Sequence, residues 1–320
     1  MANSLSDQNS PQNIADNIQF PVYLDPSAQI PSSVNLAPFC VIKAKAVIGE
    51  NVKLGVGCVI EEGAIVGANT QLGPYVTVGA GAIIGEGCDI GAHTGIGAQA
   101  SIGAGTRIGE HTTIYPYAQL GSEGFIGSNS SLGRLPKAAA TSTVKAQADL
   151  PPLTMGKGYT VGCSVVLYAG TTYGEQVFLG DGALVRERCA IGRNVVIGSH
   201  VTVENDTRIG AYTKIQTGSY ITAYMEIEER VFIAPMVTTT NDNYMGRTEK
   251  RFKSIKGATI CRGARVGGGS ILLPGIKVAP ETFVAAGALV TKDTVPKTVY
   301  KGFPAKELRE VPEEELLPEE

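Results

Sequence analysis

The sequence predicts an all-β protein folded as a parallel β-helix, and three observations support this fold class. Aliphatic residues recur at every sixth position over most of the 320 residues. Glycine is abundant at 40 residues, whereas phenylalanine is scarce at 8 and tryptophan is absent. The six-residue period is interrupted twice and resumes each time in a new phase. A short, fixed period of this kind is typical of a solenoid built from stacked repeats.

The aliphatic positions form three runs. The first covers sixteen successive positions from Ile30 to Leu120. The second runs from Val161 to Ile233 with Tyr173 as its one exception, and the third from Ile260 to Val290. We expect each hexad to form a short strand and a turn, and three hexads to form one coil. Coils then stack about 4.8 Å apart, giving about twelve coils in all.

Two further positions in the hexad support this interpretation. The residue four places after each aliphatic is small or β-branched, which suits a second inward slot. The residue directly after the aliphatic is mostly glycine, which relieves crowding where the backbone turns tightly. The pattern resembles the hexapeptide-repeat family, and this resemblance implies a left-handed helix.

The six cysteines are expected to be free. The sequence has no CxxC motif and no Cys/His cluster that would indicate a zinc site. Cys40, Cys58, Cys88 and Cys189 fall in the small inward slot, where a thiol acts as a compact apolar filler. We therefore expect buried, reduced thiols in a cytoplasmic protein and no catalytic cysteine.

Composition excludes several classes of partner. The chain carries 27 basic and 30 acidic residues, a net charge of −3, which gives no reason to expect binding to nucleic acid or an anionic membrane. No stretch approaches the roughly 18 apolar residues of a membrane span. The first twenty residues are polar and lack the apolar centre of a signal peptide.

We expect five segments along the chain. They are a polar lead (1–29), an N-terminal β-helix block (30–126), a Pro- and Ala-rich insertion (127–160), a second β-helix block (161–295) with an interrupting loop (238–258), and a C-terminal tail (296–320) with a short helix near 305–311.

The loop at 238–258 is the strongest candidate for chemistry. Loops on a rigid scaffold are favoured places for binding and catalysis. This one begins with Asn241 and Asp242, an amide and a carboxylate placed where the chain leaves the helix. Five cations follow, which suit a phosphorylated ligand but also a solvated basic loop: Arg247, Lys250, Arg251, Lys253 and Lys256.

The three histidines are expected at exposed turns, because each lies three residues after an inward aliphatic. His93 and His111 are 18 residues apart, so they should stack on one edge. The β-helical carbonic anhydrases bind a metal through a pair of histidines five residues apart, and no such pair occurs here. We expect no metal site.

Longer motifs give a second, more specific resemblance over about residues 190–308. They are "VTVENDTRIGAYTKIQTG", "IEERVFIAPMVTTTNDNY", "IKGATICRGARVGGGSILLPGIKV", "VAAGALVTKD" and "KGFPAKEL". In this order they resemble acetyltransferases that act on 3-amino sugars linked to dTDP or UDP. The resemblance implies acetyl-CoA as co-substrate, a nucleotide-sugar partner, and a homotrimer with active sites between subunits.

The resemblance also implies roles for individual residues. Asn241 and Asp242 match the family's "TND" at the reacting amine and acetyl group. Gly268, Ala286 and Lys292 match positions that meet the pantetheine arm and phosphates of acetyl-CoA. Residues on the acceptor side are Glu204, Gln216, Tyr244 and Arg247.

The loop lacks histidine, which favours transfer to an amine over transfer to a hydroxyl. A hydroxyl needs a strong base, whereas a partly neutral amine can attack the thioester directly. Our hypothesis is that Asp242 accepts a hydrogen bond or proton from the amine and that Asn241 orients the substrate or thioester.

Two alternatives remain open: a sugar O-acetyltransferase of the same fold, and a non-catalytic β-helix that acts as a scaffold or binding protein. The sequence departs from the family at "YMGR" (244–247), where a Tyr-Pro-Arg is usual, and at Ala223, where an acidic residue is common. Both departures fall on the acceptor side.

Overall fold

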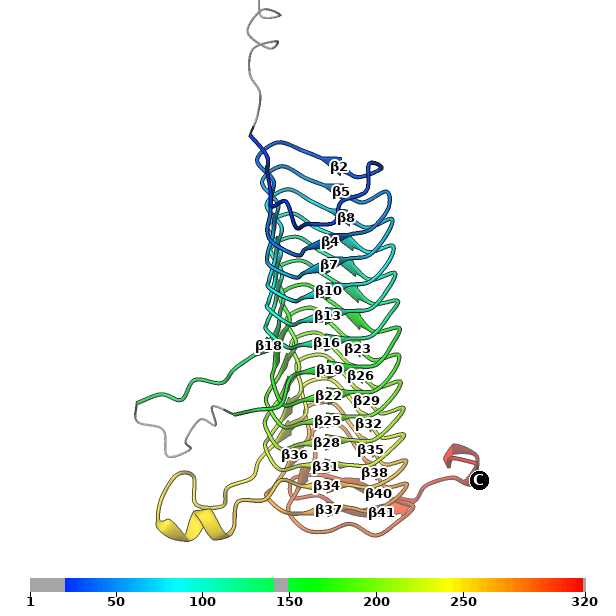
Figure 1. Ribbon diagram of the computed structural model, residues 1–320. Helices are drawn as coiled ribbons and strands as arrows, with labels where there is room; N and C mark the ends of the chain where they lie inside the picture. The colour runs from blue at the N-terminus through cyan, green and yellow to red at the C-terminus, as the bar shows by residue number, and fades with distance from the viewer. Residues whose placement is uncertain (1–20, 141–148, 319–320) are drawn as a thin grey trace, which may run out of the picture.

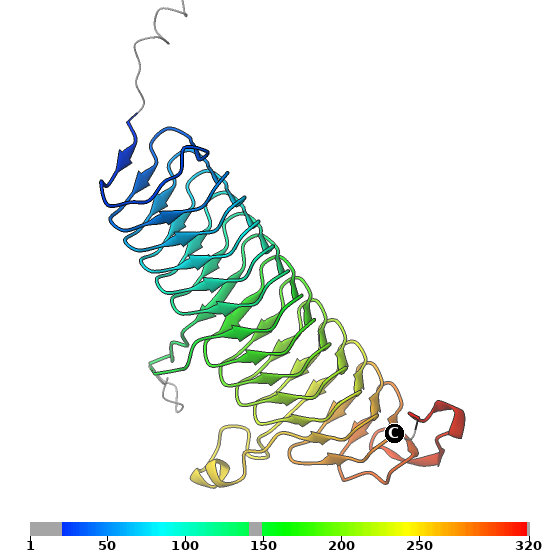
Figure 2. The same cartoon turned by 45° about the vertical axis from the view of Figure 1, so that its right-hand side comes forward.

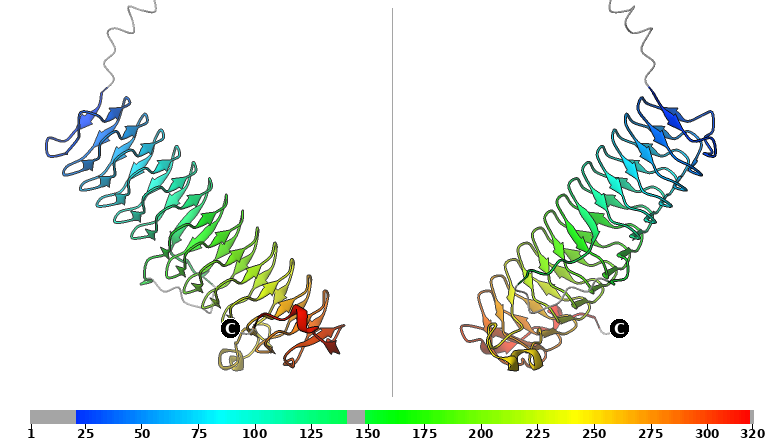
Figure 3. Two further views of the ribbon diagram at one scale, coloured as in Figure 1. Left: turned by 90° about the vertical axis from the view of Figure 1, so that its right-hand side faces the viewer. Right: turned by 60° about the vertical axis from the view of Figure 1, so that its left-hand side comes forward.

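The computed structural model describes residues 21–140 and 149–318. Most hexads form a two-residue strand followed by a turn, and the strands stack in register into three parallel sheets. These sheets are the walls of a straight prism, with the N-terminal end at the top of Figure 1 and the C-terminal end at the bottom. Figure 2 and Figure 3 show the same rod from other sides.

From β2 to β39, each sheet contains every third strand of the described chain. Sheet A consists of β1 (Tyr23–Leu24), β3 (Val41–Ile42), β6 (Val59–Ile60), β9 (Thr77–Val78), β12 (Gly95–Ile96), β15 (Thr113–Ile114), β18 (Ser131–Arg134), β21 (Val166–Tyr168), β24 (Leu184–Val185), β27 (Thr202–Val203), β30 (Tyr220–Ile221), β33 (Thr238–Thr239), β36 (Ile271–Leu272) and β39 (Leu289–Val290). Sheet B consists of β4 (Val47–Ile48), β7 (Ile65–Val66), β10 (Ile83–Ile84), β13 (Ser101–Ile102), β16 (Gln119–Leu120), β19 (Thr154–Met155), β22 (Thr172–Tyr173), β25 (Ala190–Ile191), β28 (Arg208–Ile209), β31 (Glu226–Ile227), β34 (Thr259–Ile260) and β37 (Lys277–Val278). Sheet C consists of β2 (Asn35–Leu36), β5 (Lys53–Leu54), β8 (Gln71–Leu72), β11 (Asp89–Ile90), β14 (Arg107–Ile108), β17 (Phe125–Ile126), β20 (Thr160–Val161), β23 (Phe178–Leu179), β26 (Val196–Ile197), β29 (Lys214–Ile215), β32 (Phe232–Ile233), β35 (Arg265–Val266), β38 (Phe283–Val284), β40 (Thr298–Lys301) and β41 (Lys306–Glu310).

The interior is the stack of aliphatic residues that the period predicted. In most strands the second residue points inward and is buried, while the first faces outward. Ile84, Ile102 and Ile114 are 0–1% exposed, and residues from the small slot such as Ala82 and Cys88 fill the space between them. Buried threonines satisfy their hydroxyls on the next coil, as Thr70 Oγ1 does by donating to the Gly85 carbonyl at 3.0 Å. The predicted parallel β-helix of hexapeptide repeats is confirmed.

The turns form three corners, named here for the sheets they join. In one early coil, corner CA is 37–40, corner AB is 43–46 and corner BC is 49–52. The third residue of each corner has positive φ, as in Phe39 (63°), Lys45 (58°) and Asn51 (57°). The glycine after an inward aliphatic is needed for a different reason, which is the close approach of the next coil. A Cβ at Gly103 would overlap the backbone of Ser122 on the next coil.

Both interruptions leave the rod at corner AB. Leu120 pairs with Met155, 35 residues later, and Ile227 pairs with Ile260, 33 residues later, where an uninterrupted coil takes 18. The first insertion follows β18 and the second follows β33, both strands of sheet A, and each returns to sheet B. Figure 1 shows the two loops projecting from the same side of the rod.

The ladder is longer than expected. The sheets hold 14, 12 and 15 strands in the described residues, against the expected twelve coils. Some strands lie in segments that were expected to lack the period. Their inward or paired residues are Leu132, Met155, Thr239 and Tyr300. Residues 1–20 of the expected lead and 141–148 of the expected insertion lie outside the described residues.

The expected helix near 305–311 is wrong. Residues Lys306–Glu310 form β41, which pairs antiparallel with β40. A last coil would otherwise present an unpaired strand edge, and β41 covers it. Helical geometry in the described tail is limited to the 3-10 turn η2 (Glu313–Glu315), and the loop after β33 contains a second, η1 (Glu249–Lys253).

Two buried details refine the predicted interior. All six cysteines are free; five are buried as expected, but Cys163 is exposed because it lies at corner CA rather than in the inward slot. Tyr173, the exception in the second run, is 4% exposed and its hydroxyl has no hydrogen-bond partner among the described residues. Burial raises the pKa of Tyr173 well above its usual value.

Candidate active site

The loop after β33 is organised around Asp242. Its Oδ1 accepts a hydrogen bond from the Tyr244 amide at 2.8 Å, and its Oδ2 accepts from the Gly246 amide at 2.9 Å and from Arg251 Nε at 2.9 Å. An aspartate that bonds the amide two residues on is a common turn-former. The carboxylate therefore holds the loop in a tight turn at the point where it leaves the rod.

These bonds keep Asp242 ionised. The Gly246 amide, then the Tyr244 amide, and also the Arg251 guanidinium lower the pKa of its carboxyl below the usual value. Each partner stabilises the charged form. A carboxylate with a lowered pKa is a weak proton acceptor near neutral pH, so Asp242 is suited to hydrogen bonding and charge stabilisation.

Asn241 lies directly on corner AB and is half-buried. Its Nδ2 donates to the carbonyl oxygen of Ala223, one coil earlier, at 3.4 Å. The equivalent positions in the three preceding coils, 18 residues apart, hold Ala223, Asn205 and Glu187. Ala223 presents only a methyl group between two amide side chains, which leaves room beside Asn241.

Corner AB carries a charged network that sequence reasoning missed, apart from Glu204. Arg186 donates from Nε and Nη2 to both oxygens of Glu187, at 2.8 and 3.1 Å, and reaches Glu204 at 3.4 Å. Arg188 holds Asp206 by two bonds of 2.7 Å. The Glu187 side chain is only 6% exposed.

Aromatic rings border this network. The guanidinium groups of Arg134 and Arg186 lie over the Tyr168 ring, 5.6 and 5.2 Å from its centroid. Burial and then the charge of Glu204 raise the pKa of Tyr220. The polar surface therefore extends along corner AB from the first insertion, which begins after Arg134, to the second. Shifted pKa values such as those of Arg188, Asp206 and Tyr220 occur at functional sites and also in structural ion-pair networks.

A sequence signal for the network existed. The run "VRERC" at 185–189 puts three consecutive charges at a corner. Its hexad spacing is regular, so the repeat pattern does not distinguish it from other turns. Only the structure shows that these side chains meet residues 204–206 on the next coil.

The structure sorts the predicted site residues onto two corners. Glu204, Asn241, Asp242, Tyr244 and Arg247 lie on corner AB or its loop. Lys292 joins them: it is exposed and stands in the column of Asn241, two coils further on, because β33, β36 and β39 pair in register.

The remaining predicted residues, Gln216, Gly268 and Ala286, lie on corner CA. They form part of a strip of small residues, in which Gly268 stacks between Pro235 and Ala286. A Cβ at Gly268 would approach the Pro235 carbonyl oxygen to 3.2 Å, and the neighbouring Gly287 amide donates to the Gly268 carbonyl at 2.9 Å. Within one chain, the two sets lie at opposite edges of sheet A and do not meet.

The histidines are exposed and lie on corner CA, whereas the loop leaves the rod at corner AB. Tyr75, His93 and His111 stack at corner CA, with centroids 5.0 and 4.9 Å apart, so the expected histidine stack is confirmed. His200 lies on the same corner. Among the described residues, no group of three or more His, Cys, Asp or Glu is placed to hold a metal ion. No helix in the described ranges is long and apolar enough to cross a membrane.

Comparison with known proteins agrees with the fold. Residues 63–98 match the family described as bacterial transferase hexapeptide (six repeats). The match covers 36 of the 320 residues and lies within the N-terminal part of the rod.

Two curated proteins resemble shorter parts of the chain. "Putative acetyltransferase YJL218W" of Saccharomyces cerevisiae is 31% identical over 88 residues, which is 27% of this chain and 45% of that protein. "Putative acetyltransferase C18B11.09c" of Schizosaccharomyces pombe is 43% identical over 49 residues, which is 15% of this chain and 24% of that protein. The chain thus spans less than half the length of either relative.

Among solved structures, the UDP-N-acetylglucosamine acyltransferase of Arabidopsis is 14% identical, with a TM-score of 0.37. The match covers 85% of this chain and 73% of that one.

Proposed function

We propose that the protein is an acetyl-CoA-dependent N-acetyltransferase whose acceptor is an amino sugar linked to dTDP or UDP, in cytoplasmic surface-glycan synthesis. The observation that carries the proposal is the loop at corner AB. It leaves the rod after β33 and presents Asn241 beside a turn that Asp242 fixes. The acetyltransferase names of the two relatives support the reaction class.

The placement of the two residue sets supports a site shared between subunits. Corner AB carries the candidate acceptor residues apart from Gln216, and corner CA carries Gln216, Gly268 and Ala286. In a homotrimer, corner AB of one copy would face corner CA of the next. The strip of Pro235, Gly268 and Ala286 presents no long side chain, so a narrow pantetheine arm fits along it. Lys292 would then lie where it can meet a coenzyme phosphate.

The reaction forms one bond and breaks one. The amine nitrogen attacks the thioester carbonyl carbon, the new C–N bond replaces the C–S bond, and coenzyme A leaves as the thiol. The amine must lose a proton during this exchange. Asp242 has a lowered pKa and three hydrogen bonds already, so we assign it to hold the loop and to stabilise positive charge on the amine.

Asn241 is then the residue that touches the reacting groups. Its amide can donate to the thioester oxygen or accept from the amine, and Ala223 beside it leaves the space for either. Because no base with a pKa near 7 is assigned, the amine must arrive neutral. We therefore expect kcat/KM to rise with pH and to level off above the pKa of the acceptor's amino group, where the amine is neutral.

The test is thiol release from acetyl-CoA across dTDP- and UDP-linked amino sugars, with the corresponding hydroxyl sugars as matched controls. Release with an amino sugar and not with its hydroxyl counterpart supports the proposal. Faster release with a hydroxyl sugar would make the protein an O-acetyltransferase. No release with any acceptor, together with no acetyl-CoA binding, would leave the scaffold alternative.

A further inference from the structure

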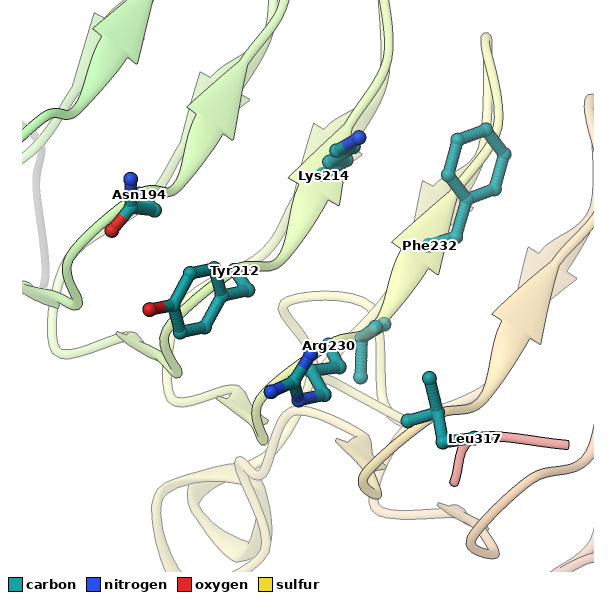
Figure 4. A pocket seen from close by; sticks show the side chains of 7 residues that line it. Asn194, Tyr212, Lys214, Arg230, Phe232 and Leu317 are labelled. Carbon is teal, nitrogen blue, oxygen red and sulfur yellow. The ribbon is translucent and has the colours of Figure 1, made fainter.

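A second pocket lies on the outer face of sheet C, away from the candidate active site. It encloses about 530 Å³. Figure 4 shows the side chains that line it: Asn194, Tyr212, Lys214, Arg230, Phe232 and Leu317. It opens toward corner BC, and neither insertion at corner AB contributes a residue.

Aromatic and cationic side chains alternate around this pocket. The Tyr212 ring lies between two guanidinium groups, with Arg193 at 5.5 Å and Arg230 at 5.0 Å from its centroid. Lys214 and Phe232 are direct register neighbours on sheet C, and both face outward. Tyr212 and Phe232 are each 40% exposed. Because guanidinium groups already lie over the Tyr212 ring, Phe232 is the ring on which a flat base could stack.

The next outward position on sheet C holds a cation, Arg265, that uses only part of its hydrogen-bonding capacity. Arg265 is the register neighbour of Phe232 and lies over the Phe283 ring at 4.9 Å. Its Nη1 donates to Glu315 at 2.7 Å. Its Nε and Nη2 are buried and have no partner among the described residues. Buried guanidinium donors without acceptors are costly, and an anion would satisfy them.

The C-terminal tail lies over part of this surface. Glu315 bonds Arg265, and the Leu317 side chain forms one wall of the pocket. The described tail is acidic at Glu313, Glu314 and Glu315. A negatively charged segment therefore already rests on the cationic ladder, held in the described residues by one ion pair at a partly exposed arginine.

We propose that this pocket binds a nucleoside diphosphate and that the acidic tail competes with the nucleotide for the same cationic surface. The base stacks on Phe232, and the phosphates meet Lys214 and the guanidinium groups over the Tyr212 ring. Aromatic stacking combined with fixed cations suits this chemical class. The pocket lies on a different face from corner AB, and the choice of nucleotides to test rests on the proposed function.

Two sources could supply such a ligand, the acceptor's nucleotide or the ADP portion of coenzyme A. The experiment is calorimetric titration of the full chain with UDP, ADP and inorganic pyrophosphate. We expect one nucleotide to bind at least about fivefold more tightly than pyrophosphate, because stacking adds to the phosphate contact. The tighter nucleotide identifies the source. Equal binding of pyrophosphate, or no binding of any probe, would overturn the proposal.

Matched variants locate the site. Lys214→Ala and Tyr212→Leu should each weaken nucleotide binding about tenfold. Lys53→Ala removes the same side chain from the equivalent outward position of sheet C, eight strands away, and should change nothing. Equal weakening by Lys53→Ala would contradict the assignment.

A chain that ends at Pro312 tests the competition. It lacks Glu315 and Leu317 but keeps β41, so the last coil stays covered. We expect it to bind the nucleotide more tightly than the full chain does. Unchanged or weaker affinity would show that the tail is not a competitor.

Discussion

The two halves of the rod share one interior and differ at corner AB. In the first half, Lys43 and Glu61 form an ion pair of 2.8 Å on that corner, with side chains 46% and 35% exposed. In the second half, Arg186 and Glu204 form an ion pair at the same corner position. Arg186 also forms an ion pair with Glu187, whose side chain is 6% exposed. The comparison teaches that the inward residues specify the rod, whereas corner AB differs between the halves in how deeply its charged side chains are buried.

The largest expected effect concerns the shared interior. Ile114→Ala and Ile227→Ala should each lower the free energy of unfolding by about 2–5 kcal/mol, because each leaves a cavity in the stack. Urea denaturation measures both, with the outward-facing Thr113→Ala as the control. If one half lost far less than the other, the interior would not be equivalent along the rod.

Substitutions at corner AB should have different effects on stability in the two halves of the rod. Glu187→Gln removes a buried charge from two arginines and should cost about 1–3 kcal/mol. Glu61→Gln breaks the exposed pair in the first half and should cost less than about 1 kcal/mol. Equal costs would mean that the second-half network is an ordinary surface feature.

Tyr173 offers a smaller effect with the opposite sign. Its buried hydroxyl has no partner in the described residues, so Tyr173→Phe removes an unsatisfied group without changing the ring. We expect stability to rise by about 1 kcal/mol. Loss of stability in the same urea assay would indicate that the hydroxyl has a partner such as a buried water.

The effect on Asp242 appears only in acid. Its pKa in the folded chain is lowered, so its contribution to loop order is full above the ordinary aspartate pKa and is lost as pH falls through the lower folded value. A carboxyl NMR titration should therefore give a midpoint below 3.8. Arg251→Gln should move the midpoint upward. A midpoint at or above the ordinary value in the unmodified chain would contradict the hydrogen bonds described.

Most of the fold could be predicted from the sequence because the hexads repeat the same pattern of residues. An inward aliphatic, a small partner and a glycine at a close approach are all local signals. Coils were missed where the inward residue was atypical, as with Met155 and Thr239. The strand β41 was missed because the signal for it is the free edge of β40, which lies outside its own sequence.

The candidate site was only partly predictable. The position of Asn241 and Asp242 follows from the interruption of the period. The bonds of Asp242 to Gly246 and Arg251 depend on the loop's path, which no repeat specifies. The Arg186–Glu187 network depends on contacts between coils, 18 residues apart for Glu204, and charge letters alone do not show whether they will meet.

The most direct measurement is kcat/KM for acetyl transfer to an amino-sugar nucleotide in Asn241→Ala, compared with Asn243→Ala. Both asparagines lie in the same loop, but Asn243 is exposed beyond the corner while Asn241 stands on it. We expect Asn241→Ala to lower kcat/KM about 10- to 100-fold, as for a lost hydrogen bond to reacting groups, and Asn243→Ala to leave it nearly unchanged. Equal activity in the two variants would contradict a catalytic site at corner AB.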